Sequence, residues 1–231
     1  VLTFGGRSLM AEPRAMAELC ARFPAAIVAG CSTAGEILDT EVTDEGLVAT
    51  ALSFDSTRVA LAAEEHASTR SSAAIGSHLA RELSASDLVH LVVFADGIGV
   101  NGSELVRGLE AGLSPRVSIT GGLAGDGTRF AETLVFAGHP LARRRVLAIG
   151  FYGERLSVGH GTLGGWDPFG PERRIADGQG VLTVQEVAGG QGSRDNVNLD
   201  HHAGGNLLAA ARAASRRSSS SGAWASQTMR V

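Results

Sequence analysis

The sequence predicts a mixed α/β domain, with helices flanking a sheet of parallel and antiparallel strands, followed by an irregular tail. Short apolar runs of strand length alternate with segments of helical periodicity. An internal repeat divides the first part of the chain, and the composition changes near residue 175. Strand–helix–strand crossovers imply parallel pairing, and hairpins add antiparallel strands. We therefore expect two tandem β-α-β-β-β repeats and a tail.

The first repeat, about residues 1–63, opens with a short apolar strand at 1–4 and continues into a helix that begins near Glu12. Pro13 falls in the first turn of this helix, where its missing N–H group costs no hydrogen bond. The apolar side chains recur at i, i+3, i+4 and i+7, which is typical of a helix face packed on a core. These side chains are Met16, Leu19, Cys20 and Phe23.

Three further strands complete the first repeat. An apolar strand at 26–29 runs into a glycine-containing turn at 30–36. Segments 47–54 and 58–63 have strand composition and are separated by Asp-Ser-Thr. We therefore predict that they form a hairpin around 55–57.

A helix over 72–83 connects the halves, because its Ile and Leu residues lie four apart. The second repeat, about residues 91–163, has its first strand at 88–95. Asn101 can cap the helix that follows, and Glu104 occupies the N3 position of that helix. This pair predicts where the second crossover helix begins.

The second repeat also contains a glycine-rich turn, at 121–127, after a strand at 116–120. An offset of 90 residues, without gaps, places the Ala-Gly-Glu of the first turn (34–36) on the Ala-Gly-Asp of the second (124–126). The order of matches is preserved over about 60 residues, which indicates an internal duplication.

The tail, residues 176–231, is dominated by Ala, Gly and Ser, and Trp224 is its only aromatic residue. We expect it to be disordered, or to result from a shifted reading frame near Arg174 and Ile175, because a wrong frame of GC-rich DNA yields this composition. The chain opens on Val1 inside a predicted strand, so we also expect its N-terminus to be a fragment edge.

Composition excludes several classes of function. The formal net charge is −4 without a long basic run, which argues against a nucleic-acid or anionic-membrane partner. No apolar run approaches the roughly 20 residues of a membrane helix. All 20 basic residues are arginine, which excludes a Schiff-base, pyridoxal-phosphate or P-loop lysine. Two cysteines are too few for a disulfide framework, so we expect a cytoplasmic protein with no metal and no cofactor.

The two glycine turns are the candidate ligand site. Each follows a predicted buried strand, and ligands of α/β sheets collect at the carboxyl ends of strands. Backbone N–H groups would bind a carboxylate, and the acid of each turn would bind an ammonium group, a combination that suits a zwitterion. The alternative is two tight turns with solvated acids. The candidate residues are Gly30, Cys31, Ser32, Thr33, Gly35, Glu36, Gly121, Gly122, Gly125 and Asp126, with Trp166 as a wall of the pocket.

Two other readings stay open. Cys31 could be a catalytic nucleophile if a turn lowered the pKa of its thiol, although a buried structural cysteine is commoner. The chain could instead be a module that docks a partner protein. The string G-x-G-x-x-G at 159–164 is not expected to bind a dinucleotide, because the prolines and glycines that follow preclude the required helix.

The strings Gly-Cys-Ser-Thr-Ala-Gly-Glu at 30–36 and Gly-Gly-Leu-Ala-Gly-Asp-Gly at 121–127 resemble the N-terminal FIST domain, a sensory module. The resemblance covers roughly residues 1–174. It implies a cytoplasmic input domain of bacterial signal transduction that binds small ligands, such as amino acids, without catalysis. It further implies a C-terminal FIST domain or a signalling output module as partner. The family offers no established ligand residues to carry over.

Overall fold

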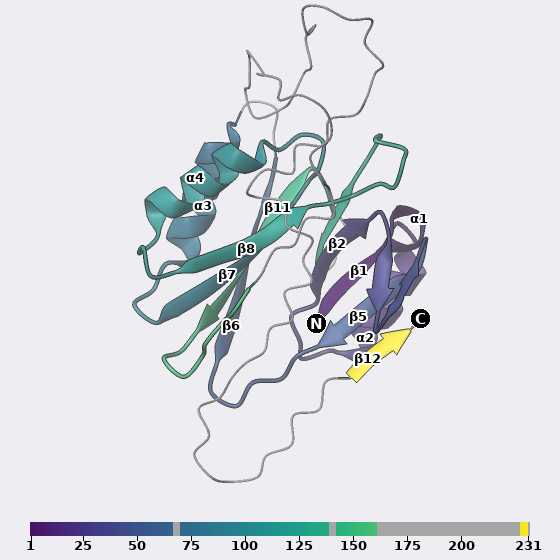
Figure 1. Ribbon diagram of the computed structural model, residues 1–231, viewed down its shortest axis with the longest axis horizontal. Coiled ribbons are helices and arrows are strands. Elements are labelled where there is room, and N and C mark those ends of the chain that lie inside the picture. The colour runs from purple at the N-terminus through teal and green to yellow at the C-terminus, as the bar shows by residue number, and fades with distance from the viewer. Residues whose placement is uncertain (67–69, 139–141, 161–226, 231) are drawn as a thin grey trace, which may run out of the picture.

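The computed structural model describes residues 1–66, 70–138, 142–160 and 227–230. Two mixed sheets pack face to face, and helices cover the outer face of each, so that the described residues form four layers (Figure 1). The predicted mixed α/β class is confirmed. Figure 1 shows α3 (Ser72–Leu83) and α4 (Gly102–Gly112) on one outer face and α1 (Arg7–Met10) and α2 (Pro13–Arg22) on the other.

The first sheet has the strand order β10-β9-β2-β1-β5-β12, and the second has the order β6-β11-β7-β8. The first comprises β10 (Ala142–Arg143), β9 (Leu134–Ala137), β2 (Ala29–Thr33), β1 (Leu2–Gly6), β5 (Leu47–Ala51) and β12 (Gln227–Arg230). The second comprises β6 (Arg58–Glu65), β11 (Arg145–Tyr152), β7 (Leu88–Ala95) and β8 (Ser118–Leu123). A separate hairpin consists of β3 (Glu36–Leu38) and β4 (Glu41–Thr43).

The two halves of the chain share one pairing pattern. In the first half β1 pairs in parallel with β2 and antiparallel with β5. In the second half β7 pairs in parallel with β8 and antiparallel with β11. Each half also supplies a strand to the other half's sheet, since β9 pairs with β2 and β6 pairs with β11. The halves are therefore interlocked by backbone hydrogen bonds.

The core follows the period-2 alternation of the strands. In β7, Val92 and Phe94 face the first sheet, and Leu91 and Val93 face the helices. Phe4 of β1 meets Phe94 edge to face, with ring centroids 5.5 Å apart, between the two sheets. The chain thus builds three apolar layers, one between the sheets and one beneath each helix pair.

The predicted hairpin of 47–54 and 58–63 is wrong. β5 lies in the first sheet and β6 in the second, so the segment between them passes from one sheet to the other. Both strands are nevertheless present, because strand composition is a local property of the sequence. Their partners were missed because β1 and β11, which flank them, are distant in the sequence.

The predicted turns also begin too early, because their first residues belong to strands β2 and β8. Gly30 and Gly121 are needed for close strand packing: a Cβ would lie 1.7 Å from the Thr3 carbonyl oxygen at the first and 2.0 Å from that of Val93 at the second. These glycines therefore mark close backbone approach within a sheet. Of the tail at 176–231, only β12 is described, so the expectation about its remainder lies outside the described residues.

Candidate functional site

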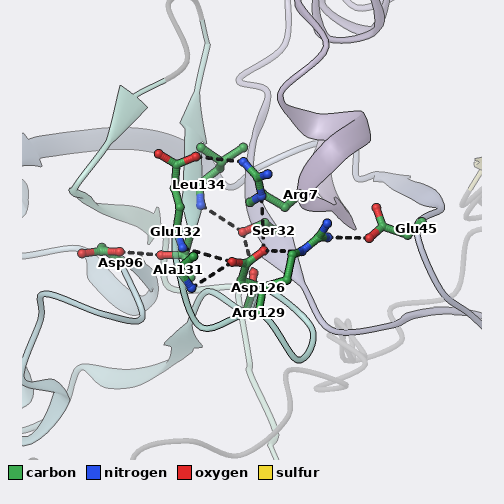
Figure 2. A network of polar contacts seen from close by, with 11 residues as sticks. Arg7, Ser32, Glu45, Asp96, Asp126, Arg129, Ala131, Glu132 and Leu134 are labelled. Carbon is green, nitrogen blue, oxygen red and sulfur yellow. Dashed lines mark hydrogen bonds and ion pairs between the residues drawn. The ribbon is translucent and has the colours of Figure 1, made fainter.

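The carboxyl ends of β2 and β8 meet, and they join the two predicted site segments. The Ser32 hydroxyl donates to the Gly125 carbonyl at 2.7 Å, and the Gly125 N–H donates to the Ser32 carbonyl at 2.8 Å. The same hydroxyl oxygen accepts the Leu134 N–H at 2.9 Å, at the start of β9 (Figure 2). A Cβ at Gly125 would lie 3.0 Å from the Ala34 nitrogen. Two segments about 90 residues apart thus form one junction, where one strand of each sheet ends.

Glu36 is buried beside this junction, with 1% of its surface exposed. One carboxylate oxygen accepts the Thr33 hydroxyl at 2.7 Å, and the other accepts the Gly46 N–H at 2.7 Å. Glu36 therefore ties the start of β3 to the end of β2 and to the entry of β5.

Asp126 is the matching acid of the second segment and is also buried. Its carboxylate accepts the N–H groups of Glu132 at 3.0 Å and Ala131 at 3.2 Å, and it lies 3.2 Å from the Arg129 Nε and 3.3 Å from the Arg7 Nε (Figure 2). Burial alone raises the pKa of Asp126, but the two backbone N–H groups and the two guanidinium charges outweigh it and lower the pKa below its usual value. Asp126 is thus an ionised anchor for the turn that follows it.

Both acids therefore have protein partners. The alternative in which they are solvated at the rim is wrong, because both are buried. A ligand ammonium group that reached either carboxylate would have to share it with the donors already in place. The two carboxylates therefore hold the backbone segments around the junction in place.

Cys31 lies in the core between the sheets, with 5% of its surface exposed. Burial raises the pKa of its thiol to about 12. The thiolate, which is the nucleophilic form, is therefore strongly disfavoured at neutral pH. The position is that of a packing cysteine.

We expect iodoacetamide to alkylate Cys31 at least about 100-fold more slowly in the folded protein than in urea, because the reaction requires an exposed thiolate. Cys20, which is half-buried, serves as the internal control and should react faster than Cys31. Mass spectrometry of labelled peptides over time measures both rates. Rapid and selective labelling of native Cys31 would contradict the packing role and would support Cys31 as a catalytic nucleophile.

A second polar cluster lies on the inner face of β8. The two ring nitrogens of His90 lie 2.7 Å from the Ser118 hydroxyl and 2.9 Å from the Thr120 hydroxyl. Burial, followed by the charge of His160, lowers the pKa of His90 to about 4, so its ring is neutral at pH 7. His90 is not among the residues that the sequence predicts for a site. The hydroxyls at alternate positions of β8 were the available signal.

The remaining candidate residues differ in accessibility. Gly30 and Ser32 are buried, whereas Thr33, Gly35, Gly121 and Gly122 are half-buried. At Gly122, and at the exposed Gly127, a Cβ would meet no atom within 4 Å, so the space beside these two backbones is open. Trp166 lies outside the described residues.

Two kinds of feature are absent from the described part of the chain. No helix in it is long and apolar enough to cross a membrane. Among the same residues, no group of three or more His, Cys, Asp or Glu side chains could hold a metal ion.

Comparison with known proteins identifies the family. A family model of the FIST N domain matches residues 1–189, and so continues past Arg174, where the sequence resemblance was expected to end. No curated protein matches the chain. FIST is a family of sensory domains, and the match spans well over half of the sequence. The chain therefore belongs to the FIST N domain family.

Proposed function

We propose that this sensory domain binds a small polar molecule, with amino acids as the first class to test, where β2 and β8 end. The Ser32–Gly125 junction carries the proposal, because a ligand that touches both segments would bias how the two halves sit together. In the proposal the domain performs no chemistry on its ligand. It passes the signal, in the bacterial cytoplasm, to a C-terminal FIST domain or another output module.

The proposed ligand contacts are the backbone of segments 30–36 and 121–127. The open space beside Gly122 and Gly127 supports an approach from the β8 side. Glu36 and Asp126 hold the two segments in place, and Trp166 stays a proposed wall of the pocket. A catalytic Cys31 is disfavoured by its burial.

Thermal-shift measurement with each standard amino acid tests the proposal. A ligand at about 100 times its dissociation constant should stabilise the domain by about 2.7 kcal/mol, or several degrees. Gly122→Val should abolish this shift, because its side chain would occupy the open space, where a Cβ meets no atom within 4 Å.

Ala63→Val is the matched control, since it adds a similar side chain to an exposed position of β6 in the same sheet. It should keep the full ligand shift. Loss of the shift in both variants would contradict the site. No shift with any amino acid would contradict the ligand class.

A further inference from the structure

The β3–β4 hairpin exposes its apolar side chains and buries a carboxylate. Ile37 pairs directly with Val42 across the hairpin, so their side chains share one face, and they are 39% and 69% exposed. Glu36, on the opposite face of β3, is buried. A shift of one residue would reverse these faces. The hydrogen bonds to Glu36 oppose that shift and keep Ile37 and Val42 facing outward.

Phe130 is also an exposed apolar residue, and it lies in a turn that is held by hydrogen bonds to a buried carboxylate. Its side chain is 79% exposed, and its backbone has φ = 48°, a left-handed conformation that bulky residues rarely adopt. Asp126 holds the turn by accepting the N–H groups of Ala131 and Glu132. Left-handed backbone at a bulky residue and exposure of an aromatic ring both disfavour folding, and strain of this kind clusters at binding sites.

An ion pair joins these two exposed apolar elements. The Arg129 guanidinium, next to Phe130, donates to the Glu45 carboxylate, just after β4, at 2.5 Å (Figure 2). Gly125 packs against Ala34 at the base of both segments. We use the name rim surface for three exposed side chains on the segments that this ion pair joins: Ile37, Val42 and Phe130.

The charge around the rim surface indicates what would cover it. Segment 36–45 contains five acidic residues and no basic residue, and of these Glu36 is buried and Glu45 pairs with Arg129. Asp39 and Asp44 are exposed, and neither has an ion-pair partner within the described residues. A second copy would present the same acids and be repelled, whereas lysine or arginine side chains would be attracted.

We propose that the rim surface docks a partner protein through a segment in which an apolar side chain is flanked by lysine or arginine. Phe130 would be the main anchor, since aromatic side chains dominate interface energies. The acids would set orientation and association rate. This surface goes beyond ligand sensing and does not depend on the ligand site.

Fluorescence anisotropy with labelled synthetic peptides tests the proposal. One peptide carries a central Trp-Leu pair flanked by arginines, and its counterpart carries the same pair flanked by glutamates. The arginine peptide should bind at least about 10-fold more tightly, and its binding should weaken with salt. Phe130→Gly and Val42→Thr should each weaken its binding about 5- to 10-fold.

The controls separate docking from folding. Phe130→Gly should leave the thermal midpoint unchanged or raise it, because glycine relieves the left-handed backbone. Ile98→Thr removes another exposed apolar side chain, outside the rim surface, and should leave peptide binding intact. Equal affinity for both peptides, no binding, or insensitivity to Phe130→Gly would overturn the proposal. A dimer in sedimentation that Val42→Thr abolishes would also overturn it, in favour of a second copy.

Discussion

Replacing Asp126 by alanine is expected to lower the free energy of unfolding by about 3 kcal/mol, because the change removes a buried carboxylate that accepts two backbone N–H groups and the Arg129 guanidinium and that forms an ion pair with Arg7. The loss would loosen the turn that follows Gly125 and the contact between the halves. Urea denaturation of the variant and the wild type at pH 7 measures the difference.

Asp44→Asn is the matched control, since Asp44 is exposed and has no ion-pair partner among the described residues. It should change stability by less than about 0.5 kcal/mol. The folded state lowers the pKa of Asp126, so its ionised form stabilises the fold above the unfolded pKa of about 4. That contribution is lost as the pH falls through the folded pKa. A difference between Asp126→Asn and wild type that persists unchanged in strong acid would contradict this account.

The free energy of unfolding should also fall by about 3 kcal/mol between pH 6.5 and pH 4 because of His90. Its pKa in the folded state is about 4, whereas an unfolded histidine has a pKa near 6.5. Between these values only the unfolded chain binds the proton, so acid favours unfolding. Above pH 6.5 the stabilising difference is fully present. Urea titrations at closely spaced pH values measure the slope.

His90→Asn should remove most of this slope. Ser118→Ala is the control, because it deletes one hydrogen bond to the ring while His90 remains buried. It should lower stability across the range and retain the pH dependence. Identical slopes for wild type and His90→Asn would show that other groups cause the acid sensitivity.

Local chemistry explains why much of the fold could be predicted. The helix with Pro13 at its start begins as expected, at α2, and Asn101 caps α4 by accepting the Glu104 N–H at 3.1 Å. Met16 and Leu19 of the predicted apolar face are buried. Such features depend on residues within one or two turns, so the sequence alone contains the information.

Contacts between distant segments explain what could not be predicted. β6 has strand composition, but only the second sheet shows that it pairs with β11. Gly30 looks like a turn residue in the sequence, yet it lies in β2. Glycine is needed at this strand position because the Thr3 backbone passes too close for any Cβ. The role of the Ser118 and Thr120 hydroxyls as partners of the His90 ring follows only from the pairing of β7 with β8.

The amino-acid sequence by itself determined the mixed α/β class, the helix starts and the two glycine segments, because periodicity, capping and backbone freedom are properties of neighbouring residues. Only the tertiary structure decided what the two acids do. The sequence predicts that Glu36 and Asp126 bind a ligand, whereas in the fold both carboxylates accept hydrogen bonds from protein donors. The physical reason is that a buried carboxylate needs donors, and those donors come from segments whose proximity no local pattern encodes.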